Sequence, residues 1–274
     1  MAGFTTVLNY RYWSDVTKSL DITGLLEDLS KAPENAVVVL QPSAHNPTGC
    51  DPSREQWARI ADVIQEKKLF PFFEVPYQGL ASGYLDDDIW PVRLFADRGL
   101  EFMVAYSLSL STALYNERVG ALAVVLNDSI DVEAVRTRLQ VTVRAMYCSP
   151  PAHGAVIAIR TLSDPVNFQE WKSCVRVMAK RIIEVRQRFR AALEEINTPG
   201  SWEHITSQTG MFSLTGLSHD QVRYLKEKHH VYLLSSGRYN ICALNDSNIH
   251  YVASAVKDAF LSVHAEGGCI KNGA

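Results

Sequence analysis

Short apolar runs alternate with amphipathic stretches along the chain. Four of these runs are mostly apolar rather than alternating, which is typical of strands that are buried in a parallel sheet. They lie at residues 36–40, 69–73, 101–106 and 121–126. Because such strands are separated by helical patterns, the sequence predicts an α/β arrangement.

The segment between the first two runs predicts a helix. Asp51 followed by Pro52 is a good amino-terminal signal, and Glu55 stands in the first turn. Apolar residues then recur at helical spacing and define one face: Trp57, Ile60, Ala61 and Ile64.

A much longer helix is predicted to begin near Pro165 and to stop at the run Asn197-Thr198-Pro199-Gly200. Its apolar positions step by three and four residues without a break: Phe168, Trp171, Val175, Met178, Ile182, Val185, Phe189, Ala192 and Ile196. We interpret this stripe as the core-facing side of a helix between two domains.

The last part of the chain predicts a small α+β unit, with a frayed tail at 266–274. Its strands are expected at 210–217 and 231–234, and its helices at 219–229 and 247–263. The predicted organisation is therefore a larger domain at 1–162, an interdomain helix at 163–197 and a small C-terminal domain at 198–274.

Composition adds mostly exclusions. The chain has 274 residues, 47% of them hydrophobic and 21% charged, with a net charge of -3, so nothing favours binding to nucleic acid. No apolar stretch reaches the roughly 18 residues of a membrane span, and Met1 to Tyr10 do not have the pattern of a signal peptide. The five cysteines form no C-x-x-C pair, which favours a reduced, cytoplasmic protein.

Metal chemistry has little support. Asp86-Asp87-Asp88 is better interpreted as acidic residues at a helix start, and His229-His230 is not at metal-ligand spacing. No metal ligand is therefore predicted.

Several motifs occur in a fixed order along the chain. They are Ala44-His45-Asn46-Pro47-Thr48-Gly49, Leu69-Phe70-Pro71-Phe72-Phe73-Glu74-Val75-Pro76-Tyr77-Gln78-Gly79, Ser107-Leu108-Ser109-Leu110 continuing to Leu114-Tyr115-Asn116-Glu117-Arg118-Val119-Gly120, Gly210-Met211-Phe212-Ser213 and Ser236-Gly237-Arg238. Together these motifs resemble the aspartate aminotransferases, above all the cytosolic ones, within the class-I pyridoxal-phosphate-dependent aminotransferase family. The resemblance extends from about Gly3 to about Phe260.

The resemblance implies a fold and a reaction. The fold would be type I of the pyridoxal-phosphate (PLP) transferases, with a large PLP-binding domain whose sheet is mainly parallel, here incomplete, and a small C-terminal α+β domain. The family reaction moves an amino group between L-aspartate and 2-oxoglutarate in the cytoplasm. A dicarboxylic amino acid or oxo acid is the implied ligand, and a homodimer or pairing with a related subunit is the implied assembly.

The resemblance also assigns cofactor contacts. Asn46 and Tyr77 match residues that hydrogen-bond the phenolic oxygen of PLP, and Glu74 matches the carboxylate at its pyridine nitrogen. Ser107 and Arg118 match phosphate ligands, since a guanidinium suits a phosphate through paired N–H donors. Taken one at a time, Asn46 could simply form a turn, Tyr77 could be a half-buried aromatic residue and Arg118 could pair with a surface carboxylate.

Two arginines match the family's substrate contacts. Arg238 matches the residue that binds the α-carboxylate of the substrate. Arg144 matches the residue that reads the distal carboxylate from the neighbouring subunit.

The main departure from the family is Leu110, which stands where the family has the lysine that forms the Schiff base with PLP. A leucine side chain has no nitrogen, so it can neither condense with an aldehyde nor carry a proton. No catalytic residue is therefore assigned, and no lysine lies between Lys68 and Lys172 to replace it.

Two further departures concern geometry. Glu74 stands at the family's aspartate and is longer by one carbon–carbon bond, about 1.5 Å, where a misplacement near 1 Å can cost about 100-fold in rate. The family's amino-terminal portion, with a phosphate-binding turn and a stacking tryptophan, has no counterpart, which predicts an uncovered sheet edge and exposed apolar surface.

Three functions remain open on the sequence. The first is a degenerate aminotransferase that is inactive in transamination but still binds dicarboxylates. The second is a residual enzyme that uses PLP without a covalent anchor. The third is a non-catalytic dimerisation or scaffold partner of a related subunit.

Overall fold

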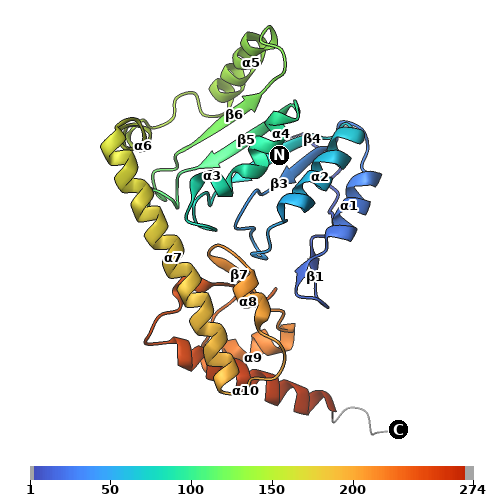
Figure 1. Ribbon diagram of the computed structural model, residues 1–274, viewed down its shortest axis with the longest axis vertical. Coiled ribbons are helices and arrows are strands. Elements are labelled where there is room, and N and C mark those ends of the chain that lie inside the picture. Colours follow the sequence, from blue (N-terminus) through green and yellow to red (C-terminus); the bar gives the residue numbers. More distant parts are fainter. Residues whose placement is uncertain (1–2, 269–274) are drawn as a thin grey trace.

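A parallel sheet with one antiparallel edge strand organises the first half of the computed structural model, which describes residues 3–268. Within those residues the strands run in the order β3 (Val37–Leu40), β4 (Phe70–Val75), β5 (Phe102–Ser107) and β6 (Gly120–Val125). The first three are parallel, and β6 pairs antiparallel with β5. The four predicted apolar runs are thus strands, and the α/β prediction is confirmed (Figure 1).

Helices pack on one face of this sheet. They are α1 (Ile22–Lys31), α2 (Arg54–Glu66) and α4 (Trp90–Asp97). Their buried residues join alternate strand residues in one hydrophobic cluster, in which Phe73, Phe95 and Phe102 are fully buried and pack edge to face. Because β3, β4 and β5 follow one another in order, right-handed crossovers place their connecting helices on the same side.

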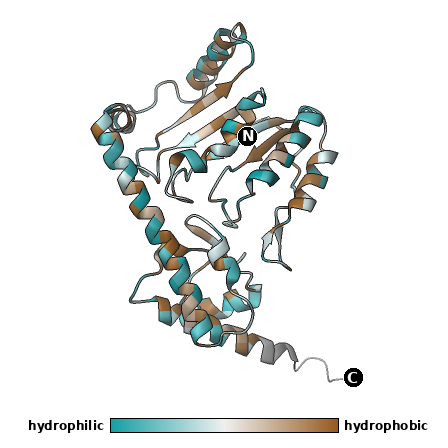
Figure 2. Ribbon diagram, viewed as in Figure 1, coloured by the Kyte–Doolittle hydropathy of each residue, from teal (hydrophilic) through white to brown (hydrophobic). Residues whose placement is uncertain are grey.

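The opposite face of the sheet is apolar and partly exposed. The register aligns Val39, Phe72, Met103 and Val124 across the four strands, so these side chains share that face. Val39 on the edge strand is 48% exposed and Leu122 on β6 is 49% exposed. The exposed apolar surface expected from the sequence is therefore present, and Figure 2 shows the strands mostly in the colours of hydrophobic residues.

Smaller elements surround the sheet. The strands β1 (Trp13–Ser14) and β2 (Ser19–Leu20) form an antiparallel hairpin ahead of α1. The short helix α3 (Leu85–Asp88) contains the acidic run, and Asp88 in it is buried and accepts hydrogen bonds from the backbone of Gly79, Ala81 and Ser82. After β6 come α5 (Asp131–Met146) and α6 (His153–Ser163). No residue of α5 is buried.

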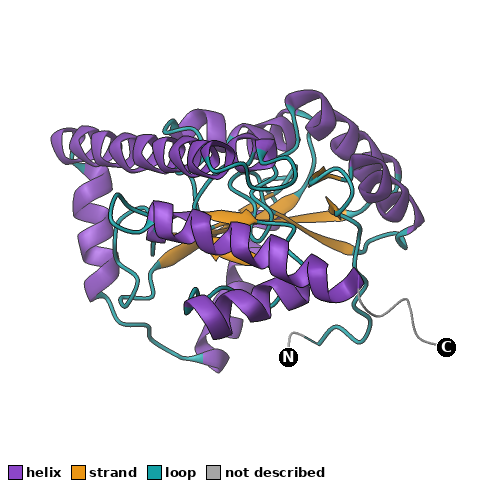
Figure 3. Cartoon of the chain, turned by 90° about the horizontal axis from the view of Figure 1, so that it is seen from below, coloured by secondary structure: helices purple, strands orange, loops and turns teal. Residues whose placement is uncertain are grey.

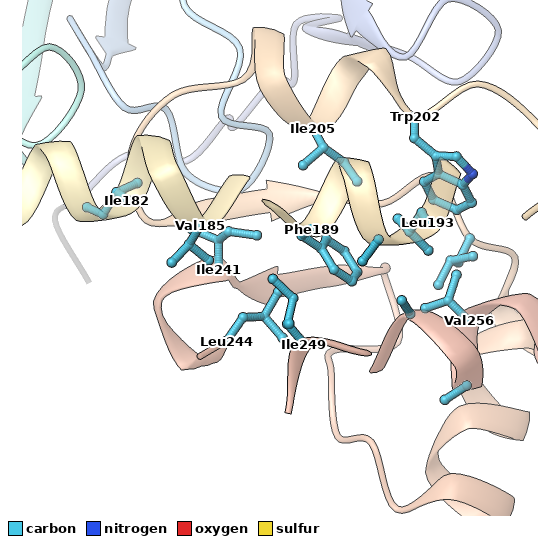
Figure 4. Close-up of a cluster of buried hydrophobic side chains, with 14 of the residues drawn as sticks. Ile182, Val185, Phe189, Leu193, Trp202, Ile205, Ile241, Leu244, Ile249 and Val256 are labelled. Atoms are coloured by element: carbon cyan, nitrogen blue, oxygen red, sulfur yellow. The ribbon is translucent and has the colours of Figure 1, made fainter. Parts of the chain in front are cut away.

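The long predicted helix is α7 (Pro165–Glu195), which runs from the sheet region into the C-terminal unit (Figure 1). The helix starts at Pro165, as predicted. The Asp164 carboxylate caps this end, because it accepts the N–H groups of Val166 and Asn167. One side of α7 is buried in the second hydrophobic cluster, where Phe189 and Leu193 face residues of the C-terminal unit (Figure 4).

The C-terminal unit contains α8 (Glu203–Ser207), β7 (Phe212–Leu214), α9 (His219–His229), β8 (Arg238–Asn240), the 3₁₀ turn η1 (Ile241–Ala243) and α10 (Ile249–Gly268). β7 and β8 pair antiparallel. Figure 3 shows helices of this unit in front of the strands when the molecule is seen from its C-terminal end. The predicted helix at 219–229 has the observed bounds, since Ser218 and Gln221 form a capping box.

The predicted strand at 231–234 is wrong. His230 adopts a left-handed conformation that ends α9, and the N–H of Val231 then bonds back to Leu225. Leu234 belongs to the turn that leads into β8, because its N–H bonds the carbonyl of Arg238. The apolar run serves the core rather than a sheet, since Val231 and Leu233 pack against the second hydrophobic cluster.

Other boundaries also differ from the prediction. The helix predicted to start at Asp51-Pro52 is α2, which begins at Arg54, because Ser53 and Gln56 form its capping box and Asp51 bonds the preceding turn instead. The strand expected at 210–217 is only Phe212–Leu214, and the last helix begins at Ile249 rather than at 247. The helix continues through 266–268, so that part of the tail is not frayed, while the rest of the tail, 269–274, lies outside the described residues. The division into domains at 1–162, 163–197 and 198–274 stays a prediction.

The C-terminal unit offers a test of pH dependence at Asp258. Its carboxylate lies 2.8 Å from His229 Nε2 and 3.0 Å from Lys228 Nζ, and these hydrogen bonds hold the pKa of Asp258 at about 2. Because this pKa lies below the unfolded value, the contribution to stability is complete above about pH 4 and is lost as the pH falls toward 2. Asp258→Asn should therefore lower the free energy of unfolding by less than about 1 kcal/mol near pH 6, because solvent screens these exposed charges.

Urea denaturation of wild type and Asp258→Asn between pH 2 and 7 measures this effect. The two stability curves should converge at low pH. A difference that stays constant down to pH 2 would mean that the carboxylate does not act through its charge.

Candidate functional site

The candidate site lies where the parallel strands end. Gln41 directly follows β3, Tyr77 follows β4 by two residues and Ser107 is the last residue of β5. Carboxyl ends of parallel strands meet at one edge of a sheet, which is where ligands bind in open α/β proteins. Two of the predicted cofactor residues, Tyr77 and Ser107, thus come from the ends of neighbouring strands.

A chain of side-chain hydrogen bonds joins three of the predicted site residues. The Nη1 of Arg238 donates to Oδ1 of Asn46 at 2.7 Å, and Nδ2 of Asn46 donates to the hydroxyl of Tyr77 at 3.2 Å. Arg238 and Asn46 are 192 residues apart in sequence, so the fold brings the C-terminal unit to the strand ends. Asn46 is fixed from both sides by these bonds.

Gln41 connects this chain to Glu74 and was not expected from the sequence. Its Oε1 accepts the N–H of Asn46 at 2.7 Å, and its Nε2 donates to Oε2 of Glu74 at 2.9 Å. Glu74 itself is exposed. The available signal was the position of Gln41, a polar residue directly after a buried strand.

The turn that carries Asn46 is fastened by Asp51. The carboxylate accepts the N–H groups of Ala44 and His45 at 2.8 and 3.0 Å, and the hydroxyl of Thr209 at 2.5 Å. Burial raises the pKa of Asp51, and these hydrogen bonds oppose the rise. Asp51 therefore ties the site turn to the C-terminal unit.

His45 has a structural place in this turn. Its ring stacks on Tyr12 with centroids 3.8 Å apart, and Nδ1 lies 2.8 Å from the hydroxyl of Thr48. Burial lowers the pKa of His45 to about 4, so the ring is neutral at physiological pH.

Arg238 presents a half-buried guanidinium that no carboxylate neutralises within residues 3–268. It lies over the ring of Phe212, 4.5 Å from the ring centroid, and Phe212 meets Tyr77 edge to face. The bond to Asn46 uses only one of its N–H donors, so the others remain for an anion. A guanidinium held in this way suits a carboxylate ligand.

Tyr77 lies between these groups and is buried. Burial raises the pKa of its phenol above the usual value, while the hydrogen bond from Asn46 opposes that rise. The neutral phenol is therefore favoured in this arrangement.

Leu110 lies in a turn just beyond β5 and is partly buried against the hydrophobic cluster that contains Tyr77. The turn is fixed to α7, because the indole N–H of Trp171 donates to the carbonyl of Ser111 at 2.7 Å. The side chain at position 110 is thus directed into apolar packing, and it brings no amine to the site.

The remaining predicted residues do not join this cluster. Ser107 accepts the N–H of Ser109, while Arg118 is exposed, donates to the carbonyl of Tyr115 and lies over the Tyr115 ring. An ion pair of Arg118 with a surface carboxylate is not among the ion pairs of the described residues. Arg144 is exposed on α5, which lies at the far end of the sheet region from the C-terminal unit (Figure 1).

Two wider properties complete the picture. Among residues 3–268 no helix is both long and apolar enough to cross a membrane. The same residues contain no cluster of three histidine, cysteine, aspartate or glutamate side chains suited to a metal ion.

Comparisons with known proteins show a family match and similar structures over most of the chain. The family described as "Aminotransferase class I and II" matches residues 1–256. The cytoplasmic aspartate aminotransferase of Gallus gallus is 46% identical over 262 residues, which are 96% of this chain and 64% of that protein. The crystal structure of aspartate aminotransferase from Trypanosoma cruzi superposes with a TM-score of 0.91 at 42% identity, over 94% of this chain and 66% of that one.

A third similar structure concerns the cofactor. The aromatic-amino-acid aminotransferase of Burkholderia pseudomallei, described as covalently bound to pyridoxal phosphate, has a TM-score of 0.90 and 33% identity, and the match covers 93% of this chain and 63% of that one. The present chain thus spans about two thirds or less of the length of these proteins.

The chain has fold type I, the fold of the aminotransferases on which it superposes, over about two thirds of their length. The chain belongs to the class I and II aminotransferases.

The residues of this chain fit the family's cofactor only in part. Asn46 and Tyr77 offer polar atoms at the strand ends, which suits contacts to a ring oxygen. Leu110 offers no atom for covalent attachment, and Arg118 is not directed to the cluster by any hydrogen bond among the described residues. Covalent attachment of PLP at position 110 therefore does not fit this chain.

Proposed function

We propose that this chain is an aspartate-aminotransferase-like protein that retains carboxylate recognition but does not attach PLP covalently and is impaired in transamination. One observation carries the proposal. Leu110 packs in apolar surroundings where the family has its lysine, beside an intact chain of hydrogen bonds from Arg238 through Asn46 to Tyr77.

The ligand class follows from Arg238. Its charge has no carboxylate partner among the described residues, and its guanidinium is half-buried against Phe212. An anionic ligand stabilises a half-buried guanidinium that has no carboxylate partner. Dicarboxylic amino acids and oxo acids are the proposed ligands, and the relative named a cytoplasmic aspartate aminotransferase supports both this class and a cytoplasmic location.

The proposed assembly is a homodimer or a pair with a related subunit. Arg144 supports this assembly, because it is an exposed residue of α5 and makes no ion pair among the described residues. Val141 and Met146 on the same helix are 62% and 73% exposed, so α5 has apolar surface that a second subunit would cover.

The first test concerns cofactor attachment. After incubation with PLP, borohydride treatment and desalting, the wild type should carry no pyridoxyl group, whereas Leu110→Lys should carry one at position 110. The reason is that only an amine can condense with the aldehyde of PLP. Absorbance and peptide mass spectrometry measure the attached group.

Leu110→Met is the matched control, because it changes the side chain without adding an amine. A wild-type protein labelled on some other lysine would overturn the loss of covalent attachment. Wild-type protein that keeps PLP through desalting without a covalent bond would favour a residual enzyme with an unanchored cofactor.

The second test concerns dicarboxylate binding. Succinate or 2-oxoglutarate should raise the melting temperature of the wild type, and Arg238→Ala should abolish the shift because it removes the cation. Thermal denaturation against ligand concentration measures it. Arg136→Ala is the control, since Arg136 makes only an exposed ion pair with Glu133. A wild type that no dicarboxylate stabilises would favour the alternative function, a scaffold partner without a small ligand.

A further inference from the structure

A cavity lies between the β1–β2 hairpin and the C-terminal unit. Its volume is about 600 Å³, which is within the usual range for small-ligand sites. The hairpin contributes Asp15 and Lys18, and the other lining residues come from 199–263. None of the residues of the Asn46–Tyr77–Arg238 cluster lines it, so this cavity is separate from the candidate site.

Lys18 supplies a fixed positive charge. Its Nζ donates to the carbonyl of Gly216 at 3.1 Å, a contact that spans 198 residues of sequence. A Cβ at Gly216 would lie 2.3 Å from that nitrogen, so the ammonium rests directly on a glycine that leaves room for it. No carboxylate pairs with Lys18 in the described part of the chain, so two of its three N–H donors have no protein partner there.

Asp15 supplies the negative charge on the same hairpin. Its Oδ1 accepts the indole N–H of Trp13 at 2.8 Å, which holds the carboxylate in place. Asp15 and Lys18 form no ion pair with each other among the described residues. The cavity therefore has two separated charges of opposite sign.

The rest of the lining is mixed, with an apolar and aromatic wall on one part of it and polar residues on the other: Ser201, His204, Thr215, Ser218 and Gln221. Trp202 is buried and meets the Phe260 ring edge to face at 5.5 Å, and Leu217 lies beside them in the lining. His204 also lines the cavity. Its side chain is buried, with 7% exposure, and its Nε2 has no hydrogen-bond partner. Burial and the nearby charge of Lys18 lower the pKa of His204 to about 4, so it adds no charge.

We propose that this cavity binds a free α-amino acid with an apolar side chain. The carboxylate of the ligand binds the Lys18 ammonium, its amino group binds Asp15, and its side chain packs against Trp202 and Phe260. The site does not depend on the proposed function, because it shares no residue with the carboxylate site at Arg238.

The two charges decide the ligand class. A simple anion would bind Lys18 but would be repelled by Asp15. A simple cation would bind Asp15 but would be repelled by Lys18. A polyanion such as a nucleotide would find one cation against one carboxylate, because His204 is neutral. A zwitterion uses both charges, and an apolar side chain uses the aromatic wall.

Because the hairpin and the C-terminal unit both line the cavity, the bound amino acid joins two parts of the fold. Its binding should therefore stabilise the whole chain.

The test is a titration of the full chain with L-phenylalanine and L-leucine. Calorimetry and tryptophan fluorescence measure the binding. Lys18→Met retains most of the side-chain stem and removes the charge, and it should weaken binding by about tenfold or more, the effect of one charge-assisted hydrogen bond. Asp15→Asn should weaken it in the same direction. 3-Phenylpropionate and phenethylamine each lack one charge and should bind more weakly than L-phenylalanine.

Two controls separate this site from the proposed carboxylate site. Lys31→Met removes an exposed lysine outside the cavity and should leave binding unchanged, and Arg238→Ala should also leave it unchanged. No saturable binding, equal binding to Lys18→Met, or loss of binding with Arg238→Ala would each overturn the proposal. Far-UV circular dichroism checks that every variant is folded, and Trp202→Phe tests independently whether the fluorescence change comes from the cavity wall.

Discussion

Replacing Arg186 by methionine is expected to lower the free energy of unfolding by about 3–5 kcal/mol, because it leaves several buried carbonyls without their donor, each at a cost of roughly 1–3 kcal/mol. Arg186 lies on α7 and is only 2% exposed. Its guanidinium donates to the carbonyls of Ile205, Thr209, Gly210 and Phe212. Methionine fills similar space but leaves these carbonyls without a donor in a buried region, which is costly.

Urea denaturation of wild type and Arg186→Met measures the loss. Arg190→Met is the matched control. Arg190 lies one turn later on α7, pairs with Glu194 and Glu203 and donates to the hydroxyl of Thr206, and its side chain is 31% exposed, so its loss should cost less, about 1–2 kcal/mol. Arg186→Lys keeps the charge but not the fork of N–H donors, and it should fall between the two. If the Arg186→Met protein is as stable as the control, the carbonyls that Arg186 bonds in the wild type must find other donors.

Arg186 also connects the stability of the C-terminal unit to the candidate site. Gly210 and Phe212, whose carbonyls it holds, belong to the segment that places the Phe212 ring under Arg238. The stabilisation by dicarboxylates should therefore weaken in Arg186→Met together with the fold.

Local sequence signals determined the regular elements well. The start of α7 could be predicted near Pro165 because a proline at a helix start is a local signal, and its apolar stripe follows from helical spacing. The bounds of α9 likewise depend on a capping box of adjacent residues. By contrast, 231–234 has the composition of a strand but packs as an irregular apolar segment, because the left-handed His230 and the turn before β8 fix its backbone.

The candidate site could be predicted only through the family resemblance. Asn46 and Arg238 lie far apart in sequence, and no local pattern announces that they meet. Gln41 and Arg186 were missed because each acts through hydrogen bonds to groups that only the tertiary fold brings close. Arg186 is a charged residue inside an apolar stripe, and its partners are backbone carbonyls that a sequence does not display.

The sheet shows a different limit. Val37 and Val39 belong to a run whose composition is typical of a strand buried on both faces, yet they are 41% and 48% exposed. The apolar pattern indicates which surfaces favour burial. It does not indicate whether they are covered, and among the described residues helices cover only one face of this sheet. The pattern therefore predicted the strands correctly and their environment only in part.

Asp51→Ala is expected to lower the free energy of unfolding by about 3 kcal/mol, because it leaves several buried donors without an acceptor. The carboxylate holds the N–H groups of Ala44 and His45 and the hydroxyl of Thr209. It therefore fixes the turn of Asn46 and joins that turn to the segment after α8.

The same variant should lose dicarboxylate stabilisation, because a loose turn no longer places Asn46 against Arg238. Asp51→Asn keeps one carbonyl acceptor and should lose less on both counts, while Asp62→Ala removes only an exposed ion pair with Arg98 and should keep the ligand response. Urea denaturation and thermal shifts with succinate measure the two effects separately. If Asp51→Ala loses stability but keeps the full ligand shift, the turn is not what positions Asn46, and Arg238 alone must account for carboxylate binding.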